Sequence, residues 1–570
     1  MTSPATLEQE TRSSETAFLS DRVSRHRMVA GVASGFLLWT SFPPLEWSWI
    51  AWIALAPLFW LATLGGSRWK TYLAAWAGGL VFWLLALEWV RVADSSAWLG
   101  WIFMATIFSL WWPGFLALAR WSVYRLQIPL ILAAPIIWVA GEFIRAYFLS
   151  GLPWYYLAHS QFRHLYLIQI ADLTGSLGIS FLITVFNAFV VDLLSRPLLQ
   201  ITKTGTRLAR RQHVRLCLVT VLLGMTACYG AIRIAYALFH DGPRLALLQS
   251  NIEQRLKMTG DPLKTIARFE ALIEQAIADS EPPDLIVWPE TSYPYGFIAI
   301  DSKIDPAALE RQVHSISSEI TVEKWLRKKQ AIEEDLHEWV NRIKIPMLVG
   351  SSFHDHTPVS HAKYNSAILF SPAVSDTQFY HKMHLVPMGE YIPFIDIMPW
   401  LSMLTPYHGE RLPRLNFGDQ PRLISLHEQL MAVTICFEDT IPQVINRFFA
   451  EPGERQPDVL INLSNDGWFH GSAELDMHLA IGVFRAVEHR VPLARAVNTG
   501  FSALVDGNGE IRAFLPKDTE DILAVTVPLD DRRSLYSRFG DWLGLSCLAV
   551  TIGLVPIGIV RKPRGPARQN

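Results

Sequence analysis

The sequence predicts a two-part protein, with a multi-pass α-helical membrane domain of eight spans and an extracytoplasmic α/β domain. The first observation is composition: the 570 residues are 51% hydrophobic and only 18% Asp, Glu, Lys or Arg, whereas about 25% is usual. The second is clustering, because eight long apolar stretches flank one mixed block. The third is the pattern of that block, which alternates short β-rich runs with helical stretches as α/β folds do.

Each apolar stretch is close to the ~20 residues that a helix needs to cross the hydrocarbon core. The first is marginal, because Pro43 and Pro44 end it early. A signal peptide is the alternative for this stretch, but no small-residue cleavage site follows and another span begins at once. The predicted spans are 28–45, 47–64, 72–91, 97–119, 128–147, 175–195, 216–239 and 541–560.

Lys and Arg are unequally distributed over the connections between these spans. Alternate connections, starting with the N-terminal segment and ending with the tail, hold 18 of them, whereas the other three hold only Arg91, Arg145 and Arg163. Positive residues of short loops stay in the cytoplasm. The predicted order is therefore a cytoplasmic segment 1–27, seven spans within 28–240, a periplasmic catalytic block 241–537, an eighth span 541–560 and a cytoplasmic tail 561–570.

The block 241–537 has the periodicities of an α/β domain. The helix that we expect over 307–343 is highly charged on one face, which is typical of a solvated surface helix. The other expected helices cover 261–279, 441–450 and 473–490. The expected strands are Arg244–Asn251, Leu285–Pro289, Met347–Phe353, Ser366–Phe370, Met431–Phe437, Val459–Ser464, Leu493–Val497 and Ile522–Val527.

Composition excludes several classes of protein. The 22 Trp and 30 Phe exclude a disordered chain, and a net charge of −2 gives no electrostatic bias toward nucleic acid. Four cysteines without a close pair provide neither a disulfide framework nor a CxxC metal site. The histidines lack metal-ligand spacing such as HExxH, and no Gly-rich phosphate loop is present. We therefore expect no metal and no nucleic-acid partner.

Three segments place reactive side chains at the ends of predicted strands, where α/β sheets bind ligands. They contain Glu290, Lys382 with Glu390, and Cys436. Each alone has an ordinary explanation, as a helix cap, a solvated cation or a small buried core residue. Cys436 is nevertheless the only cysteine of the block, because Cys217, Cys228 and Cys547 all lie in apolar spans.

A thiol that acts as a nucleophile requires a base to generate the thiolate and a cation or dipole to stabilise the oxyanion. Glu, Lys and Cys can supply these roles together. A Cys-His pair is an open alternative, with His381, His384 and His470 as candidates.

These segments resemble the Glu-Lys-Cys triad of the nitrilase, or carbon-nitrogen hydrolase, superfamily, whose fold is an αββα sandwich. The flanking residues are more specific and resemble the apolipoprotein N-acyltransferase family. They read WPET around Glu290, KMHLVPMGEYIPF from Lys382, ICFED around Cys436 and NLSNDGWF from Asn462. The membrane half agrees, with LPWYYLAHSQF at 152–162 and LIQIADLTGSLGISFL at 167–182. The resemblance covers most of residues 28–560.

The resemblance implies that Cys436 is the nucleophile, Glu290 the general base and Lys382 the oxyanion-stabilising group. It also implies that Glu390 orients the lysine or assists acyl transfer. Two positions depart from the family pattern. Phe437, which precedes Glu438, stands where the family often has Tyr, so a hydroxyl role is lost there. Met258 stands where relatives commonly have Trp; its apolar side chain can still contact an acyl chain.

The activity that the resemblance implies is acyl transfer in two half-reactions, without a cofactor. The donor is the sn-1 chain of a phospholipid, with phosphatidylethanolamine expected, and the acceptor is the N-terminal amine of S-diacylglyceryl-cysteine in apolipoproteins. We expect a monomer in the bacterial inner membrane with its active site in the periplasm. Two alternatives remain: a membrane-tethered amidase that uses water as acceptor, and a non-catalytic membrane scaffold or transporter.

Overall fold

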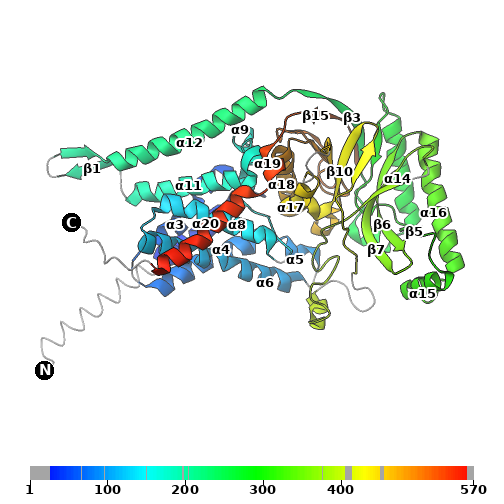
Figure 1. Ribbon diagram of the computed structural model, residues 1–570, viewed down its shortest axis with the longest axis horizontal. Helices are drawn as coiled ribbons and strands as arrows, with labels where there is room; N and C mark the ends of the chain where they lie inside the picture. The colour runs from blue at the N-terminus through cyan, green and yellow to red at the C-terminus, as the bar shows by residue number, and fades with distance from the viewer. Residues whose placement is uncertain are drawn as a thin grey trace.

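The computed structural model describes the chain from residue 26 to residue 560. Excepted are residues 66, 95–96, 149, 196–197, 203–204, 375–376, 405–413 and 450–454. The expected cytoplasmic segment 1–27, except for its last two residues, and the tail 561–570 lie outside the described residues. A bundle of long helices occupies one end of the molecule and two β-sheets occupy the other (Figure 1).

Six apolar helical runs among the described residues are long enough to cross a membrane. They are α4 with α5 (Arg68–Ala86 and Val90–Ala93), α6 through α7 to η2 (Ala97–Ser109, Trp111–Arg120 and Trp121–Leu126), α8 (Leu130–Tyr147), α11 (Ser176–Ser195), α12 (Arg210–Ala235) and α20 (Trp542–Val560). The protein therefore has a multi-pass membrane part. The two remaining expected spans form shorter helices, over 26–40 and over Ser48–Thr63, so the number eight stays a prediction.

Small residues allow the first helix to pack closely on α4. A Cβ atom on Gly31 would lie 1.9 Å from the Ala74 carbonyl oxygen, and one on Gly78 would lie 2.1 Å from the Gly31 carbonyl oxygen. Only glycine tolerates such approach of two backbones, which is how helices commonly associate in membranes. The short helix 26–40 is thus a packed part of the bundle.

The α/β part is built on two sheets whose strand orders are β14-β13-β12-β11-β10-β9 and β15-β3-β4-β6-β7-β8, with β5 paired to β6. The first contains β9 (Leu423–Leu426), β10 (Gln429–Ile435), β11 (Val459–Ser464), β12 (Leu493–Val497), β13 (Ala503–Val505) and β14 (Ile511–Phe514). The second contains β3 (Phe239–Gln249), β4 (Leu285–Val287), β5 (Phe297–Ile300), β6 (Met347–His356), β7 (His361–Phe370), β8 (Gln378–His381) and β15 (Asp521–Asp530). The central strands β10, β11 and β12 are parallel, as are β3, β4 and β6.

Alternation along the strands creates four layers. Leu245 and Leu247 of β3 join the core that contains β10 and β11, whereas Ala246 and Leu248 join the core under α14 (Pro262–Ile277) and α16 (Val322–Ile343). Successive side chains of a strand point to opposite faces, so the two sheets pack face to face with helices outside. On the far side, α17 (Pro442–Arg447) and α18 (Ala473–His489) cover the other sheet.

Most expected elements are present, although the bounds of several differ from the prediction. The single helix over 307–343 is wrong, because α15 (Pro306–Ile316) ends before α16 begins, and Thr321 caps α16 by accepting a hydrogen bond from the Lys324 amide. The expected strand 431–437 ends at Ile435. The expected helix 441–450 is described only as α17, with residue 450 outside the described part. The strands β5, β8, β9, β13 and β14 and the hairpin β1–β2 (Leu199–Thr202 and Gly205–Leu208) were not expected, and none exceeds four residues.

A buried cluster of charged side chains joins the helical bundle to the α/β part. Asp172, in α10 (Ala171–Thr174) of the membrane half, accepts hydrogen bonds from the Arg490 guanidinium at 2.7 and 3.0 Å and from the Tyr229 hydroxyl at 2.8 Å. The Arg233 guanidinium of α12 lies 2.8 Å from the same carboxylate. Arg490 follows α18, so the α/β part has a fixed position over the helical bundle.

Candidate active site

Cys436 follows the last residue of β10 and begins η6, a short 3-10 helix over Cys436–Thr440. Its φ of 53° lies in the left-handed region, which is costly for a residue with a Cβ atom. The Asn462 side-chain amide of β11 donates to the Cys436 carbonyl oxygen at 3.0 Å. The strand therefore ends in a sharp turn at Cys436, which is half-buried.

Lys382 lies just after β8 with two carboxylates around its ammonium group. The Nζ atom is 3.3 Å from Glu290 Oε1 and 2.9 Å from Glu390. The Asn365 side-chain amide donates to both carboxylates, at 2.7 and 3.0 Å, and the Val386 amide donates to Glu390 at 2.8 Å. Because Lys382 is 0% and Glu290 7% exposed, these contacts replace water as the partners of the charges.

The electrostatics connect these groups to Cys436. Burial raises the pKa of the Cys436 thiol and Glu290 raises it further, whereas Lys382 lowers it. Burial alone lowers the pKa of Lys382, but Glu390, Glu290 and Cys436 outweigh it and hold this pKa well above its usual value. The lysine therefore stays charged and favours the thiolate.

Glu438 links the turn at Cys436 to the segment that follows Lys382. Its carboxylate accepts hydrogen bonds from the Met383 and His384 amides at 2.6 and 2.9 Å, from the Ile435 amide at 2.8 Å and from the Tyr380 hydroxyl. Burial raises the pKa of Glu438 to about 7 despite Lys382 and these donors. Glu438 is thus a clamp between two segments, fully buried and directed away from solvent.

The remaining expected residues flank the thiol or lie outside the description. The Phe437 ring stacks on Trp154 of the membrane half at 6.3 Å and lies 6.0 Å from the His384 ring. Met258 belongs to α13 (Gln254–Thr259), but its side chain lies outside the part that is described.

The alternative of a Cys-His pair gains no support. The His381 ring bonds to the Ser366 hydroxyl at 2.7 Å and stacks on Tyr364. His470 follows η7 (Asp466–Phe469) in the left-handed region. His384 packs against Phe437. Among the described residues, the structure shows no hydrogen bond between the His384 ring and the Cys436 thiol.

Two polar residues of the site were not expected from the sequence. Lys257 of α13 donates to the Glu290 carbonyl oxygen at 2.7 Å; burial lowers its pKa to about 8, although Glu290 and Cys436 act in the other direction. Asn365 bridges the two carboxylates. The signal for Asn365 was its place directly before the predicted strand Ser366–Phe370. Lys257 had no signal beyond its neighbour Met258.

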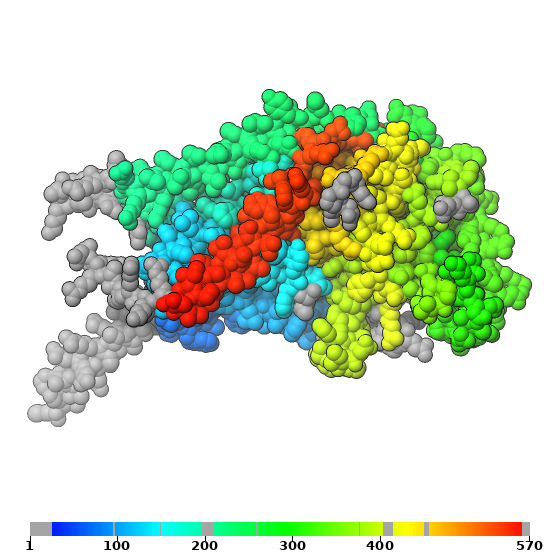
Figure 2. Space-filling view, viewed as in Figure 1, coloured from blue at the N-terminus to red at the C-terminus, as the bar shows by residue number. Residues whose placement is uncertain are grey.

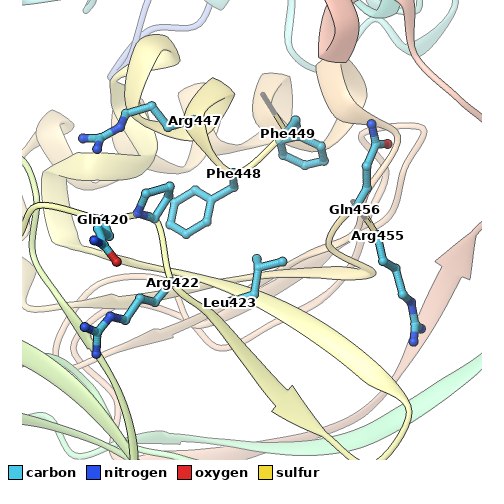
Figure 3. A pocket seen from close by; sticks show the side chains of 9 residues that line it. Gln420, Arg422, Leu423, Arg447, Phe448, Phe449, Arg455 and Gln456 are labelled. Carbon is cyan, nitrogen blue, oxygen red and sulfur yellow. The ribbon is translucent and has the colours of Figure 1, made fainter. Parts of the chain in front are cut away.

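The arrangement is suited to nucleophilic acyl transfer. It provides a thiol on a sharp turn, a carboxylate that can take a proton, and a buried ammonium that can stabilise an oxyanion. A surface cavity of about 420 Å³ lies elsewhere, between the approach to β9 and the end of α17 (Figure 3). It is lined by arginines, glutamines and phenylalanines, including Arg422, Arg447 and Phe448, and by none of the site residues above.

Comparison with known proteins gives matches over both parts of the chain. The family model "Apolipoprotein N-acyltransferase N-terminal domain" matches residues 34–189, and the model "Carbon-nitrogen hydrolase" matches residues 244–536. An apolipoprotein N-acyltransferase of Geobacter metallireducens is 31% identical, over 95% of this chain and 97% of that protein. One of Rhodopirellula baltica is 28% identical, over 93% and 97%. A solved carbon-nitrogen hydrolase of Helicobacter pylori G27 matches 56% of this chain and 93% of that chain, with 15% identity and a TM-score of 0.35.

Proposed function

Because the chain belongs to the apolipoprotein N-acyltransferase family, we propose that it transfers the sn-1 acyl chain of a phospholipid to the N-terminal amine of diacylglyceryl apolipoproteins. The observation that supports this most is the ammonium of Lys382 between Glu290 and Glu390, within electrostatic reach of Cys436. These groups are the ones that a two-step transfer through a thioester requires.

In the first half-reaction, Glu290 takes the proton of the Cys436 thiol, and the sulfur attacks the ester carbonyl carbon. A C–S bond forms, and the oxyanion of the tetrahedral intermediate faces the Lys382 ammonium. Collapse breaks the C–O bond to glycerol, whose oxygen leaves with the proton from Glu290. The products are a thioester on Cys436 and a lysophospholipid.

In the second half-reaction, the α-amine of the lipidated cysteine attacks the thioester carbonyl. Glu290 takes a proton from the attacking nitrogen, and the C–S bond breaks as the amide forms. The Cys436 thiolate is then reprotonated from Glu290, which restores the starting state. No redox partner or cofactor enters this balance.

Both substrates are lipids, which explains why an α/β domain is joined to a membrane bundle. Exposed apolar side chains, among them Ile397 and Trp400, lie on the segment 387–404 that follows Lys382, and η4 (Pro399–Leu404) contacts α6. In Figure 2 this yellow-green segment forms a lobe beside the helical bundle. We propose that it faces the outer leaflet of the inner membrane, with both termini cytoplasmic and the protein a monomer.

The test is mass spectrometry of the purified full chain after incubation with phosphatidylethanolamine. We expect a hydroxylamine-sensitive acyl mass on the peptide that contains Cys436, and none in Cys436→Ala. A diacylglyceryl peptide added afterwards should gain that acyl chain as an amide. Acyl groups only on another peptide, or release of free carboxylate from a small amide with no transfer to the peptide, would instead favour a hydrolase.

A further inference from the structure

A second cluster of charged side chains lies behind the nucleophile turn and takes no part in the reaction above. Its members come from η6, η7, α18 and β12, and each is at least 96% buried. They are Asp439, Asp466, Glu474, His478 and Arg495. Burying so many charges is costly unless they compensate one another, so the arrangement calls for a role.

His478 is at the centre of this cluster. Its Nε2 atom lies 2.7 Å from Asp439 Oδ1, and its Nδ1 atom lies 3.4 Å from Asp466 Oδ1 and 3.8 Å from Glu474 Oε1. Arg495 approaches from β12, with Nη1 3.5 Å from Asp439 Oδ2 and Nη2 3.8 Å from Asp466 Oδ2. The two aspartates are thus bracketed by two cationic side chains.

The charges balance within the cluster. Burial and Arg495 lower the pKa of His478, but Asp439 and Asp466 overcome them and raise it to about 10. Burial, with Asp466, raises the pKa of Glu474 well above its usual value. Asp439 and Asp466 therefore lie between His478 and Arg495, and the environment of Glu474 favours its neutral form.

Asp466, Glu474 and His478 offer donor atoms within 4.8 Å of one another, a spacing that a metal ion could use. The Arg495 guanidinium, however, already lies against the Asp439 and Asp466 oxygens that would attract such an ion. A divalent cation there would meet the positive charge of the arginine at close range. The cluster is better explained by its connection to Cys436.

That connection has two parts. Asp439 is three residues after Cys436 on η6, whose first residue has a strained backbone that only surrounding contacts can maintain. Asp466, in turn, is one of the charges that raise the pKa of the Cys436 thiol, with Glu290 and Glu390, against Lys382. His478 contacts both aspartates, so it can hold the turn and offset the unfavourable charge.

The cluster also touches the membrane half. Trp154, which stacks on Phe437, lies 5.9 Å from the His478 ring, and its indole nitrogen donates to the Thr440 hydroxyl at 3.2 Å. Trp154 and His478 therefore contact each other and the same short helix, η6.

We propose that His478, with Asp439, Asp466 and Arg495, is a positioning assembly for Cys436. The histidine fixes the nucleophile turn through Asp439 and cancels the Asp466 charge that would otherwise disfavour the thiolate. This inference rests on the proposed function only in that Cys436 is the nucleophile. Its effect on the thiol can be measured without any acyl donor.

The test compares His478→Leu, which removes both ring nitrogens, with His478→Gln, whose amide can still donate to Asp439. The first readout is the pH dependence of Cys436 alkylation by iodoacetamide, followed by mass spectrometry of its peptide. Both variants keep the other charged groups that face the thiol, which are Glu290, Lys382, Glu390, Asp466 and Lys257. We expect the midpoint to rise by about one pH unit in His478→Leu, equivalent to a tenfold loss of thiolate, and by less in His478→Gln.

The second readout distinguishes charge from folding. In the double variant His478→Leu with Asp466→Asn, the uncompensated anion is gone, so the alkylation midpoint should return toward wild type. Acylation of Cys436 by phosphatidylethanolamine should be at least ~10-fold slower in His478→Leu and partly restored in His478→Gln. If His478→Leu does not fold, two other variants test the proposal. The alkylation midpoint should then lie at higher pH in His478→Gln and at lower pH in Asp466→Asn than in wild type.

The proposal would be overturned by an unchanged alkylation midpoint in folded His478→Leu, or in both His478→Gln and Asp466→Asn. A stoichiometric divalent metal that wild type retains and His478→Gln loses would also overturn it. These outcomes are separate from failure of the proposed function. That failure would be seen in wild type itself, as the absence of an acyl mass on Cys436.

Discussion

The junction between the two halves and the apolar segment 387–404, which we propose as the approach for lipid, are built in opposite ways. At the junction, Asp172 is 1% exposed and has Arg490, Arg233 and Tyr229 as partners. On the approach, Ile397 is 79% and Trp400 56% exposed. The first region is polar and buried, and the second is apolar and exposed.

The difference indicates a division of tasks. A buried ion cluster has a definite geometry and loses much stability when one partner is removed, so it fixes the sheets relative to the helices. Exposed large apolar side chains next to a membrane bundle are suited to lipid contact. The acyl transfer that we propose needs a fixed nucleophile and an approach that lipid can enter.

The largest expected effect lies at the site itself, where Lys382→Met should abolish acylation of Cys436. Without the ammonium, Glu290 and Glu390 repel each other, and no cation offsets the oxyanion. The measurement is the hydroxylamine-sensitive acyl mass, with Cys436→Ala as the reference for zero. Acylation at more than a few per cent of the wild-type rate would mean that another group stabilises the oxyanion.

A substitution at the junction should change the free energy of unfolding rather than the chemical step. Arg490→Met leaves Asp172 with fewer partners in a buried place, and we expect a loss of about 3–5 kcal/mol in the free energy of unfolding. Arg327→Met is the matched control, because Arg327 pairs with Glu323 on the exposed face of α16; it should cost less than about 1 kcal/mol. Equal unfolding midpoints in urea for the two variants would remove the distinction between the two regions.

A pH-dependent effect is expected at Lys257, with its pKa lowered to about 8. Below pH 8 the side chain is charged and favours the Glu290 and Cys436 anions, and above pH 8 wild type loses this support. Lys257→Arg keeps its charge at all these values, so its acylation rate relative to wild type should rise several-fold between pH 7 and 9.5. Lys257→Met, uncharged throughout, should be slower at pH 7 and differ least at pH 9.5. If the ratio of the Lys257→Arg rate to the wild-type rate is constant across this range, the titration of Lys257 does not cause a pH dependence of acylation.

The fold was largely predictable because its strongest elements have regular patterns. The strands Val459–Ser464 and Leu493–Val497 have the predicted bounds, since each is a short, mostly apolar run that is buried on both faces. The break in 307–343 was missed because amphipathic periodicity continues on both sides of a local cap at Thr321. Short edge strands such as β8 were missed because four residues give too little alternation to detect.

The grouping of the candidate site residues was predictable from the sequence, but the residues that support them were not. Glu290, Lys382 and Cys436 stand in specific motifs, and the structure brings the carboxylate and the ammonium to 3.3 Å. Lys257 lies on a separate helix, α13, and donates a hydrogen bond to the main-chain carbonyl of Glu290. His478 lies 42 residues after Cys436 in the chain and contacts its turn only because α18 packs on η6. Such contacts depend on tertiary packing and leave no local pattern.

The smallest expected effect is on the approach, where Ile397→Asp tests lipid contact directly. The side chain is exposed, so the substitution breaks no packed core and should change the free energy of unfolding by less than ~0.5 kcal/mol. A carboxylate on a lipid-facing surface is nevertheless unfavourable, so the apparent KM for phospholipid in vesicles should rise a few-fold while kcat changes little. Val359→Asp is the control, because Val359 is 92% exposed and lies on the turn between β6 and β7. Equal KM values for the two variants would mean that the segment 387–404 does not face the bilayer, and the contrast between a fixed junction and a lipid-facing approach would then rest on burial alone.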